Sequence, residues 1–174
     1  TRSARPVMTA TMQEFGETVV LLQYSRARHQ FWAIDAVESD HAIRYVWESL
    51  RTWKDLYLGC SGKGILAFLP EDEREEIIAA LPEPDPGVKD STKARLRAEL
   101  DQARSLGYVV THGERYAGAI GASAPIRDAN GTVIGDLAIF WPDSRASAEK
   151  EARAAVAVVR AAAEVSARMG YREG

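Results

Sequence analysis

Cysteine is nearly absent from this 174-residue sequence, which contains only Cys60. One thiol excludes an internal disulfide and gives no reason to expect an oxidising compartment. No apolar run approaches the roughly 20 residues that a membrane-spanning helix needs. The chain also does not open with the charged segment, apolar stretch and small-residue cleavage site of a secretory signal. We therefore expect a cytoplasmic protein without a membrane partner.

A surplus of basic charge is also lacking, because 22 Lys and Arg stand against 25 Asp and Glu, for a formal net charge of -3. A domain that binds duplex DNA usually gathers basic residues on one face, since phosphate neutralisation dominates its affinity. Acids and bases here alternate along residues 71–76 and 93–99, which is typical of solvated helix faces. Histidine is scarce too, and His29, His41 and His112 have no partners at helical spacing. The residues therefore predict neither a DNA-binding face nor a metal site, and no cofactor is expected.

What is present is the composition of one globular domain, with 46% hydrophobic and 27% charged residues. An N-terminal helix is expected, with Ser3 as its cap, Pro6 in its first turn and Gly16 at its end. β-Branched and aromatic residues then predict strands over 18–24, 31–37 and 43–47. The connections between them are too short for crossover helices, so these strands should be antiparallel.

The middle of the chain predicts three helices, over 59–68, over 70–81, and from a cap at Asp90 or Ser91 to Gly107, with a stiff Pro-rich loop at 82–87. The apolar stripe of the third helix is Leu96, Leu100, Ala103 and Leu106. Strands follow over 108–111, 119–126 and 132–141, the last two joined by a hairpin turn at 128–131. An Ala-rich helix is expected over 147–169, with an inward face of Val156, Val159, Ala163 and Ser166. The fold class is α+β, one antiparallel sheet with helices packed on it.

The segment Gly59-Cys60-Ser61-Gly62-Lys63-Gly64 is the most informative local feature. It lacks the four-residue spacer and the hydroxyl residue after the Lys of a phosphate loop, so a nucleoside triphosphate site is excluded. Small residues at a helix start expose backbone N–H groups where the helix dipole favours an anion, so a carboxylate could dock there. Tight packing of the helix on the sheet explains the same residues equally well, and both alternatives stay open.

Cys60 could be a nucleophile at that helix start, with His112 as a distant base. A lone Cys is more often a buried apolar residue, and no catalytic signature accompanies this one. Residues 119–124 and 138–141 bring small and aromatic side chains onto neighbouring strands. Where these strands meet the helix that begins near Cys60, they predict a concave apolar pocket, unless they are simply core. Phe140 or Trp141 could stack on a flat ligand, but only one of the two can point inward.

Short segments in a fixed order run through nearly the whole chain. They are Gly16-Glu17-Thr18, residues 37–39 and 62–70, Leu96, Glu99-Leu100, Arg104, Gly107-Tyr108, Glu114, Gly118, residues 124–126 and 128–131, Pro142, Arg145, Ser166 and Met169-Gly170. In their order and spacing they resemble the effector-binding domain of the IclR family of bacterial transcription regulators.

The resemblance implies a GAF-like, profilin-like fold, with a central antiparallel sheet flanked by helices. It implies that residues 1–16 are a linker and first helix from a winged helix-turn-helix domain that the chain lacks, and that residues 17–174 are the ligand-sensing domain. DNA would be bound only through that N-terminal domain, the protein would be a homodimer or homotetramer, and the effector would be a small organic acid. The pocket positions carried over from the family are Cys60, Ser61, Thr111, Ala119, Gly121, Ala138 and Phe140.

The sequence departs from the family pattern at the pocket. The family's frequent Pro-x-His before the small-residue turn is Leu56-Tyr57-Leu58 here, and its Ser-Gly-Pro strand ending is Phe140-Trp141-Pro142. Members that bind very small keto acids have hydroxyl residues where this chain has Ala138 and Phe140. These changes predict a more apolar pocket and a larger or aromatic effector. We expect no catalysis; the alternatives are a small Cys60-dependent enzyme on the same fold and a pure oligomerisation module with a filled pocket.

Overall fold

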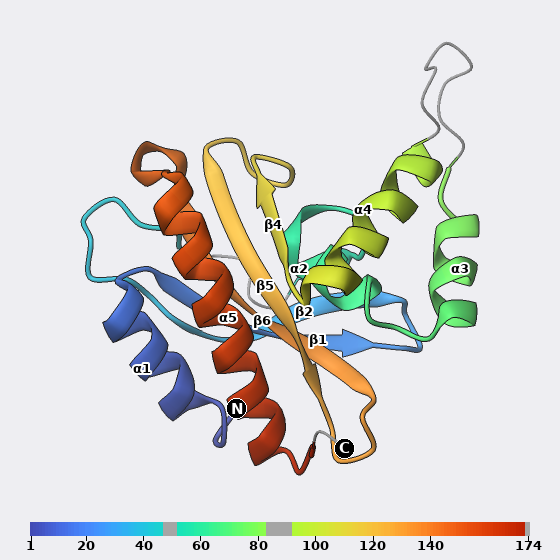
Figure 1. The fold of residues 1–174 in the computed structure, drawn as a ribbon, viewed down its shortest axis with the longest axis horizontal. Helices are drawn as coiled ribbons and strands as arrows, with labels where there is room; N and C mark the ends of the chain where they lie inside the picture. The colour runs from blue at the N-terminus through green and yellow to red at the C-terminus, as the bar shows by residue number, and fades with distance from the viewer. Residues whose placement is uncertain (47–51, 83–91, 173–174) are drawn as a thin grey trace.

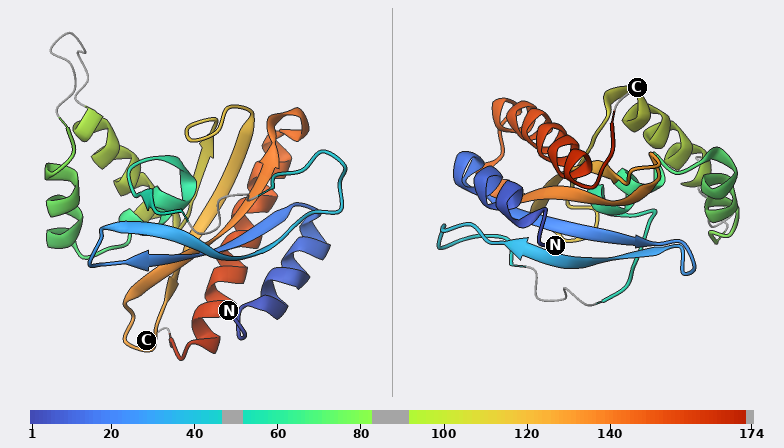
Figure 2. Two further views of the ribbon diagram at one scale, coloured as in Figure 1. Left: turned by 180° about the vertical axis from the view of Figure 1, so that it is seen from behind. Right: turned by 90° about the horizontal axis from the view of Figure 1, so that it is seen from below.

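A single curled antiparallel sheet organises the molecule (Figures 1 and 2). The computed structural model describes residues 1–46, 52–82 and 92–172. Within these ranges the sheet has six strands in the order β3-β2-β1-β6-β5-β4, and every neighbouring pair is antiparallel. The strands are β1 Thr18–Ser25, β2 Gln30–Val37, β3 Lys54–Asp55, β4 Val109–His112, β5 Ala119–Arg127 and β6 Val133–Pro142. The expected α+β class and antiparallel sheet are confirmed.

Helices cover both faces of this sheet. On one face α1 (Arg5–Phe15) packs beside the long α5 (Ala148–Arg168), as Figure 1 shows in blue and red. On the other face lie α2 (Gly59–Leu66), α3 (Glu71–Ala79) and α4 (Thr92–Leu106), and the short 3-10 helix η1 (Asp143–Arg145) follows β6. Two hydrophobic cores result, one against α1 and α5 and one against α2, α3 and α4.

Strand β6 divides its side chains between the two cores. Phe140 belongs to the core beneath α2, whereas Trp141 is fully buried in the core beneath α5. Adjacent residues of a strand point to opposite faces, so the expectation that only one of this pair faces the α2 side holds, and that residue is Phe140.

Most predicted helix ends agree with the structure. Gly16 ends α1 with φ +83°, and Gly107 follows α4 with the same left-handed value, where Gly carries no steric penalty. Ser3 was expected to cap α1, and this was wrong: the cap position is Ala4, which makes no side-chain cap bond. The expected cap at Asp90 or Ser91 and the loop beyond Pro82 lie outside the described residues.

The predicted strand over 43–47 is wrong for its described part. Residues 44–46 have no regular secondary structure, and the short β3 pairs with β2 instead; Trp47 lies outside the described residues. Alternating apolar residues in this segment suggested a strand, yet Ile43 is 71% exposed. Side chains, not a neighbouring strand, bind its carbonyls: Arg145 donates to Ile43 O at 2.8 Å and Thr18 Oγ1 to Tyr45 O at 2.8 Å.

The predicted inward face of the last helix is also wrong except at Ser166. Val156 is 68% exposed, Val159 is 38% exposed, and Ala163 is exposed as well. The buried face consists of Ala154, Ala155, Ala157, Val158, Ala161, Ala162, Val165 and Ser166. Alanine has no side chain beyond Cβ, so an alanine-rich face lets the helix axis approach the sheet closely. The larger valines were taken as the packing residues, but two of them face outward. In the same way, Leu106 of the predicted α4 stripe is exposed, while Leu96, Leu100 and Ala103 are buried.

Candidate functional site

A cavity lies where the start of α2 meets strands β4, β5 and β6. It is lined by Phe31, Tyr45, Gly59, Cys60, Ser61, Thr111, Glu114, Arg115, Tyr116, Ala119, Ile120, Gly121 and Phe140. Six of the seven expected pocket residues are among them: Cys60, Ser61, Thr111, Ala119, Gly121 and Phe140. Ala138 is not part of the lining. It lies two residues before Phe140 on β6 and is fully buried. The structure therefore brings together side chains from positions 31 to 140, although ligand binding by them stays a prediction.

Small residues let α2 lie directly on the sheet at this cavity. A Cβ at Gly121 would come within 2.5 Å of Cys60 Sγ and 2.7 Å of Phe140 Cε1. A Cβ at Gly62 would lie 2.6 Å from the carbonyl oxygen of Leu56, and one at Gly64 would collide with Ser123. The close-packing explanation of the small-residue segment thus holds at Gly62 and Gly64, while Gly59, Cys60 and Ser61 line the cavity.

The start of α2 already holds a carboxylate of the protein. Gly59 N–H donates to Glu114 Oε2 at 3.0 Å. The buried Lys63 donates to the Glu114 carboxylate at 2.8 Å and to Glu99 at 2.6 Å, so the charge of Glu114 is balanced. Helix starts favour negative charge, and here an internal residue uses that property. Docking of a ligand carboxylate at this helix start stays a prediction, because Glu114 of the chain itself occupies the N–H of Gly59.

Aromatic and cationic side chains from loops complete the wall. The Tyr45 ring stacks on Phe140 at a centroid distance of 4.7 Å and meets the edge of Tyr116 at 6.0 Å. Arg115 lies 5.5 Å from the Phe31 ring centroid and donates to Leu58 O at 2.6 Å. Sequence reasoning missed these residues because loops have no periodicity to reveal which side chain points inward. The only available signal was polar and aromatic residues within connecting segments, where binding residues often lie.

Cys60 has none of the properties of an activated nucleophile. Burial, and then the nearby carboxyl of Asp136, raise the pKa of the Cys60 thiol to about 12. Its imagined base is elsewhere: His112 is an exposed side chain whose Nε2 lies 2.9 Å from Glu151 on α5. A neutral thiol without a base does not attack substrates. The site is instead a small, mostly apolar cavity.

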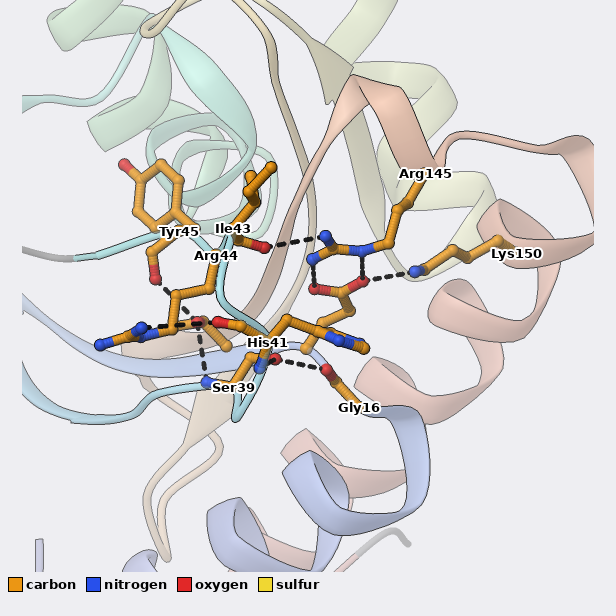
Figure 3. A network of polar contacts seen from close by, with 10 residues as sticks. Gly16, Ser39, His41, Ile43, Arg44, Tyr45, Arg145 and Lys150 are labelled. Atoms are coloured by element: carbon orange, nitrogen blue, oxygen red, sulfur yellow. Dashed lines mark hydrogen bonds and ion pairs between the residues drawn. The ribbon is translucent and has the colours of Figure 1, made fainter.

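A buried polar cluster connects the cavity wall to the end of α1 (Figure 3). Glu17 is fully buried and accepts from Arg145 Nε at 2.7 Å, from Arg145 Nη2 at 2.6 Å, and from Lys150. Burial raises the pKa of Glu17, but the hydrogen bonds from Arg145 and Lys150 outweigh it and leave that pKa below its usual value. Through Ile43 O, Arg145 also fixes the segment that carries Tyr45. We refer to Glu17, Arg145 and Lys150 as the Glu17 cluster.

The family model described as "Bacterial transcriptional regulator IclR C-terminal" matches residues 1–167. The chain belongs to this family. Glu17 and Arg145, two positions that carried the resemblance in the sequence, are direct partners in the structure. The curated relatives of this IclR-family chain are named as transcriptional regulators.

Two curated relatives and one solved structure illustrate the similarity. The chain is 33% identical over 118 residues to the probable HTH-type transcriptional regulator ArcR of Halobacterium salinarum, covering 66% of this chain and 44% of ArcR. It is 28% identical over 171 residues to the HTH-type transcriptional regulator KipR of Bacillus subtilis, covering 97% of this chain and 66% of KipR. The crystal structure of Thermotoga maritima IclR matches with a TM-score of 0.86 and 30% identity, over 98% of this chain and 68% of that one. The chain thus spans about half to two thirds of the length of these curated relatives.

Two further observations concern other kinds of site. Among the described residues, no helix combines the length and apolar character that crossing a bilayer requires. In the same part of the chain, no three His, Cys, Asp or Glu side chains are grouped so that they could share a metal ion.

Proposed function

We propose that this chain is the effector-sensing domain of an IclR-type transcription regulator, and that the effector is a small organic acid with a flat, apolar part. The observation that carries this proposal is the cavity itself: six family pocket positions from α2, β4, β5 and β6 converge on one enclosed space. Small-molecule sites are typically concave and mostly apolar, with a few polar groups that fix the orientation of the ligand.

The lining suggests how such an acid is held. The hydroxyls of Ser61 and Thr111 offer hydrogen bonds to a carboxylate, and Arg115 adds positive charge nearby. Lys63 offsets the charge of Glu114 and so reduces its repulsion of an anion. Phe140, Phe31 and Ala119 supply apolar surface for the rest of the effector, in place of the hydroxyls that a very small keto acid would need.

Regulation would use parts beyond this domain. A DNA-binding half would precede residues 1–16, and the domain would assemble as a homodimer or homotetramer in the cytoplasm. An effector acts only if it binds one arrangement of that assembly more tightly than another.

The test is thermal unfolding of the 174-residue domain against a panel of small aliphatic and aromatic carboxylates. A ligand at a hundredfold excess over its Kd adds about 2.7 kcal/mol to the stability of the folded state. We expect stabilisation by aromatic acids, abolished by Ser61→Trp in the cavity and retained by Ser105→Trp on the exposed face of α4. Equal stabilisation of both variants would place the ligand elsewhere.

One observation favours a second candidate function, a pure oligomerisation module with a filled pocket. The free volume of the cavity is about 30 Å³, which accommodates one or two water molecules. No stabilisation by any acid, together with intact self-association of the domain, would support this alternative and contradict the sensor.

A further inference from the structure

The cavity is lined like a ligand site, but its free volume is much smaller than that of such sites. Pockets for small organic ligands usually measure about 300–1,000 Å³, roughly ten times or more the 30 Å³ found here. Four aromatic rings surround this small space, those of Phe31, Tyr45, Tyr116 and Phe140. An aromatic acid can enter only if one of these rings moves.

Tyr45 and Tyr116 are the two rings carried by irregular segments, and of these Tyr116 is already 40% exposed while Tyr45 is the one stacked on Phe140. Phe31 and Phe140 belong to β2 and β6, where moving the backbone breaks the hydrogen bonds of the sheet. Tyr45 lies in an irregular segment, and its neighbours Ile43, Arg44 and Val46 are exposed. The described contacts of this segment include the stacking of the Tyr45 ring on Phe140 and the bonds that Thr18 and Arg145 donate to its carbonyls.

The Tyr45 ring also has the position that a flat ligand would take. It lies nearly parallel to Phe140, with 4.7 Å between centroids and 19° between planes, and forms a T-shaped pair with Tyr116 at 61°. Aromatic rings favour these two arrangements for any aromatic partner. On the basis of the proposed function, we propose that the Tyr45 ring is a displaceable occupant of the effector pocket, so that Tyr45 determines which acids the pocket accepts.

Displacement of the Tyr45 ring would disturb the hydrogen bonds at the end of α1. The carbonyl of Tyr45 accepts from Thr18 Oγ1, which in turn accepts from Ser39 N–H at 3.2 Å. Ser39 Oγ donates to the carbonyl of Gly16, the residue that ends α1, at 2.6 Å. These contacts lie beside the Glu17 cluster in Figure 3. These hydrogen bonds connect the Tyr45 backbone to the junction between α1 and β1. A Tyr45 ring that leaves the pocket would therefore shift that junction, so that occupancy of the pocket affects α1.

Calorimetry with benzoate and acetate tests this on the whole domain, using Tyr45→Ala, Tyr45→Phe and, as a matched control, the exposed Tyr57→Ala. If the unoccupied state of the pocket is populated at about 1–10%, removing the ring raises benzoate affinity about 10- to 100-fold. Acetate needs far less room and has no ring to take the place of Tyr45, so its affinity should rise much less than that of benzoate. Tyr45→Phe and Tyr57→Ala should bind both acids as the unmodified domain does.

The outcomes separate this inference from the proposed function. Weaker benzoate binding by Tyr45→Ala would mean that Tyr45 contacts the bound acid; the sensor would stand and the displaceable ring would fall. If no variant binds a carboxylate but Tyr45→Ala takes up neutral indole, the organic-acid function fails and the displaceable ring stands. Uptake of neither by Tyr45→Ala overturns the inference.

Hydrogen exchange tests the same inference in the unmodified domain, so it does not require that a variant folds. In the unmodified domain with saturating benzoate, the amides of Ser39 and His41 should exchange faster, because their partners Thr18 Oγ1 and Ser39 Oγ belong to the disturbed path. Unchanged exchange at both amides in a domain that binds benzoate would show that the Tyr45 segment does not move.

Discussion

At the scale of single residues, burial decides chemical character in this molecule. Cys60 and Glu17 are both buried, yet one stays neutral and the other stays charged. Cys60 has no cationic partner, so burial suppresses its thiolate, whereas Glu17 has two cations within hydrogen-bond distance. The two cationic partners, acting against burial, therefore make Glu17 a charged structural anchor, whereas burial alone leaves Cys60 inert.

The inertness of Cys60 can be measured by alkylation. With a thiol pKa of about 12 and a buried sulfur, iodoacetamide at pH 8 should modify the folded domain at least about 100-fold more slowly than the urea-unfolded chain. An aromatic acid bound in the pocket should slow the reaction further. Rapid alkylation of Cys60 in the folded domain would support the alternative in which Cys60 is a nucleophile.

Glu17→Gln should destabilise the domain in a pH-dependent way. The lowered pKa of Glu17 means that its charge stabilises the fold fully above the usual value of 4.5, and that this contribution is lost as the pH falls through the folded-state pKa. Breaking this buried pairing should cost about 2–3 kcal/mol at pH 7 and progressively less below pH 4.5. Denaturant unfolding from pH 7 to pH 3 measures both.

Glu14→Gln serves as the control for this series. The pair of Glu14 with Arg160 is exposed on both sides, so its loss should change stability by less than about 0.5 kcal/mol. A Glu17→Gln penalty that stays constant down to pH 3 would contradict the charge-based explanation.

At the scale of elements, α5 shows why the buried face of an alanine-rich helix is hard to predict from its sequence. Its apolar residues occur all around, so periodicity alone gives no unique inward face. The structure selects the face with the smallest side chains, and only Ser166 of the predicted set lies on it.

A matched pair of substitutions tests this orientation. Val158→Ala removes two methyl groups from a fully buried position and should cost about 1–3 kcal/mol. Val156→Ala, two residues earlier on the exposed face, should change stability by less than about 0.5 kcal/mol. Equal effects in thermal unfolding would mean that the two faces were assigned the wrong way round.

The strands show how far sequence reasoning reaches. Apolar, β-branched and aromatic residues predicted β1, β2, β5 and β6 to within a few residues, because β1, β5 and β6 are buried over most of their length and β2 is buried at alternate positions in its first half. The segment 43–46 has the same β-branched and aromatic residues but was misassigned, since its carbonyls bind Thr18 and Arg145 from distant parts of the chain. Six pocket positions followed from the family resemblance. The place of Tyr45 in the pocket lining could not be predicted, because no local pattern indicates which residue of an irregular segment points inward.

At the scale of the whole molecule, the sheet joins two cores into one cooperative unit. Strands β1, β2 and β6 contribute buried side chains to both cores, so neither core should melt alone. Leu100→Ala in one core and Val165→Ala in the other should each shift a single unfolding transition. Far-UV circular dichroism and tryptophan fluorescence should give coincident curves for both variants, with exposed Leu106→Ala close to the unmodified domain. Separate transitions for the two variants would disprove this coupling.

The alternation along β6 has a consequence for how such domains diverge. Ala138 and Phe140 face the side of α2, while Leu137, Ile139 and Trp141 face α5. Selection for a new effector can therefore act on alternate codons of one strand, leaving those between them to preserve the scaffold. Single substitutions at these alternate positions would change the α2 side of the sheet and leave the core beneath α5 intact.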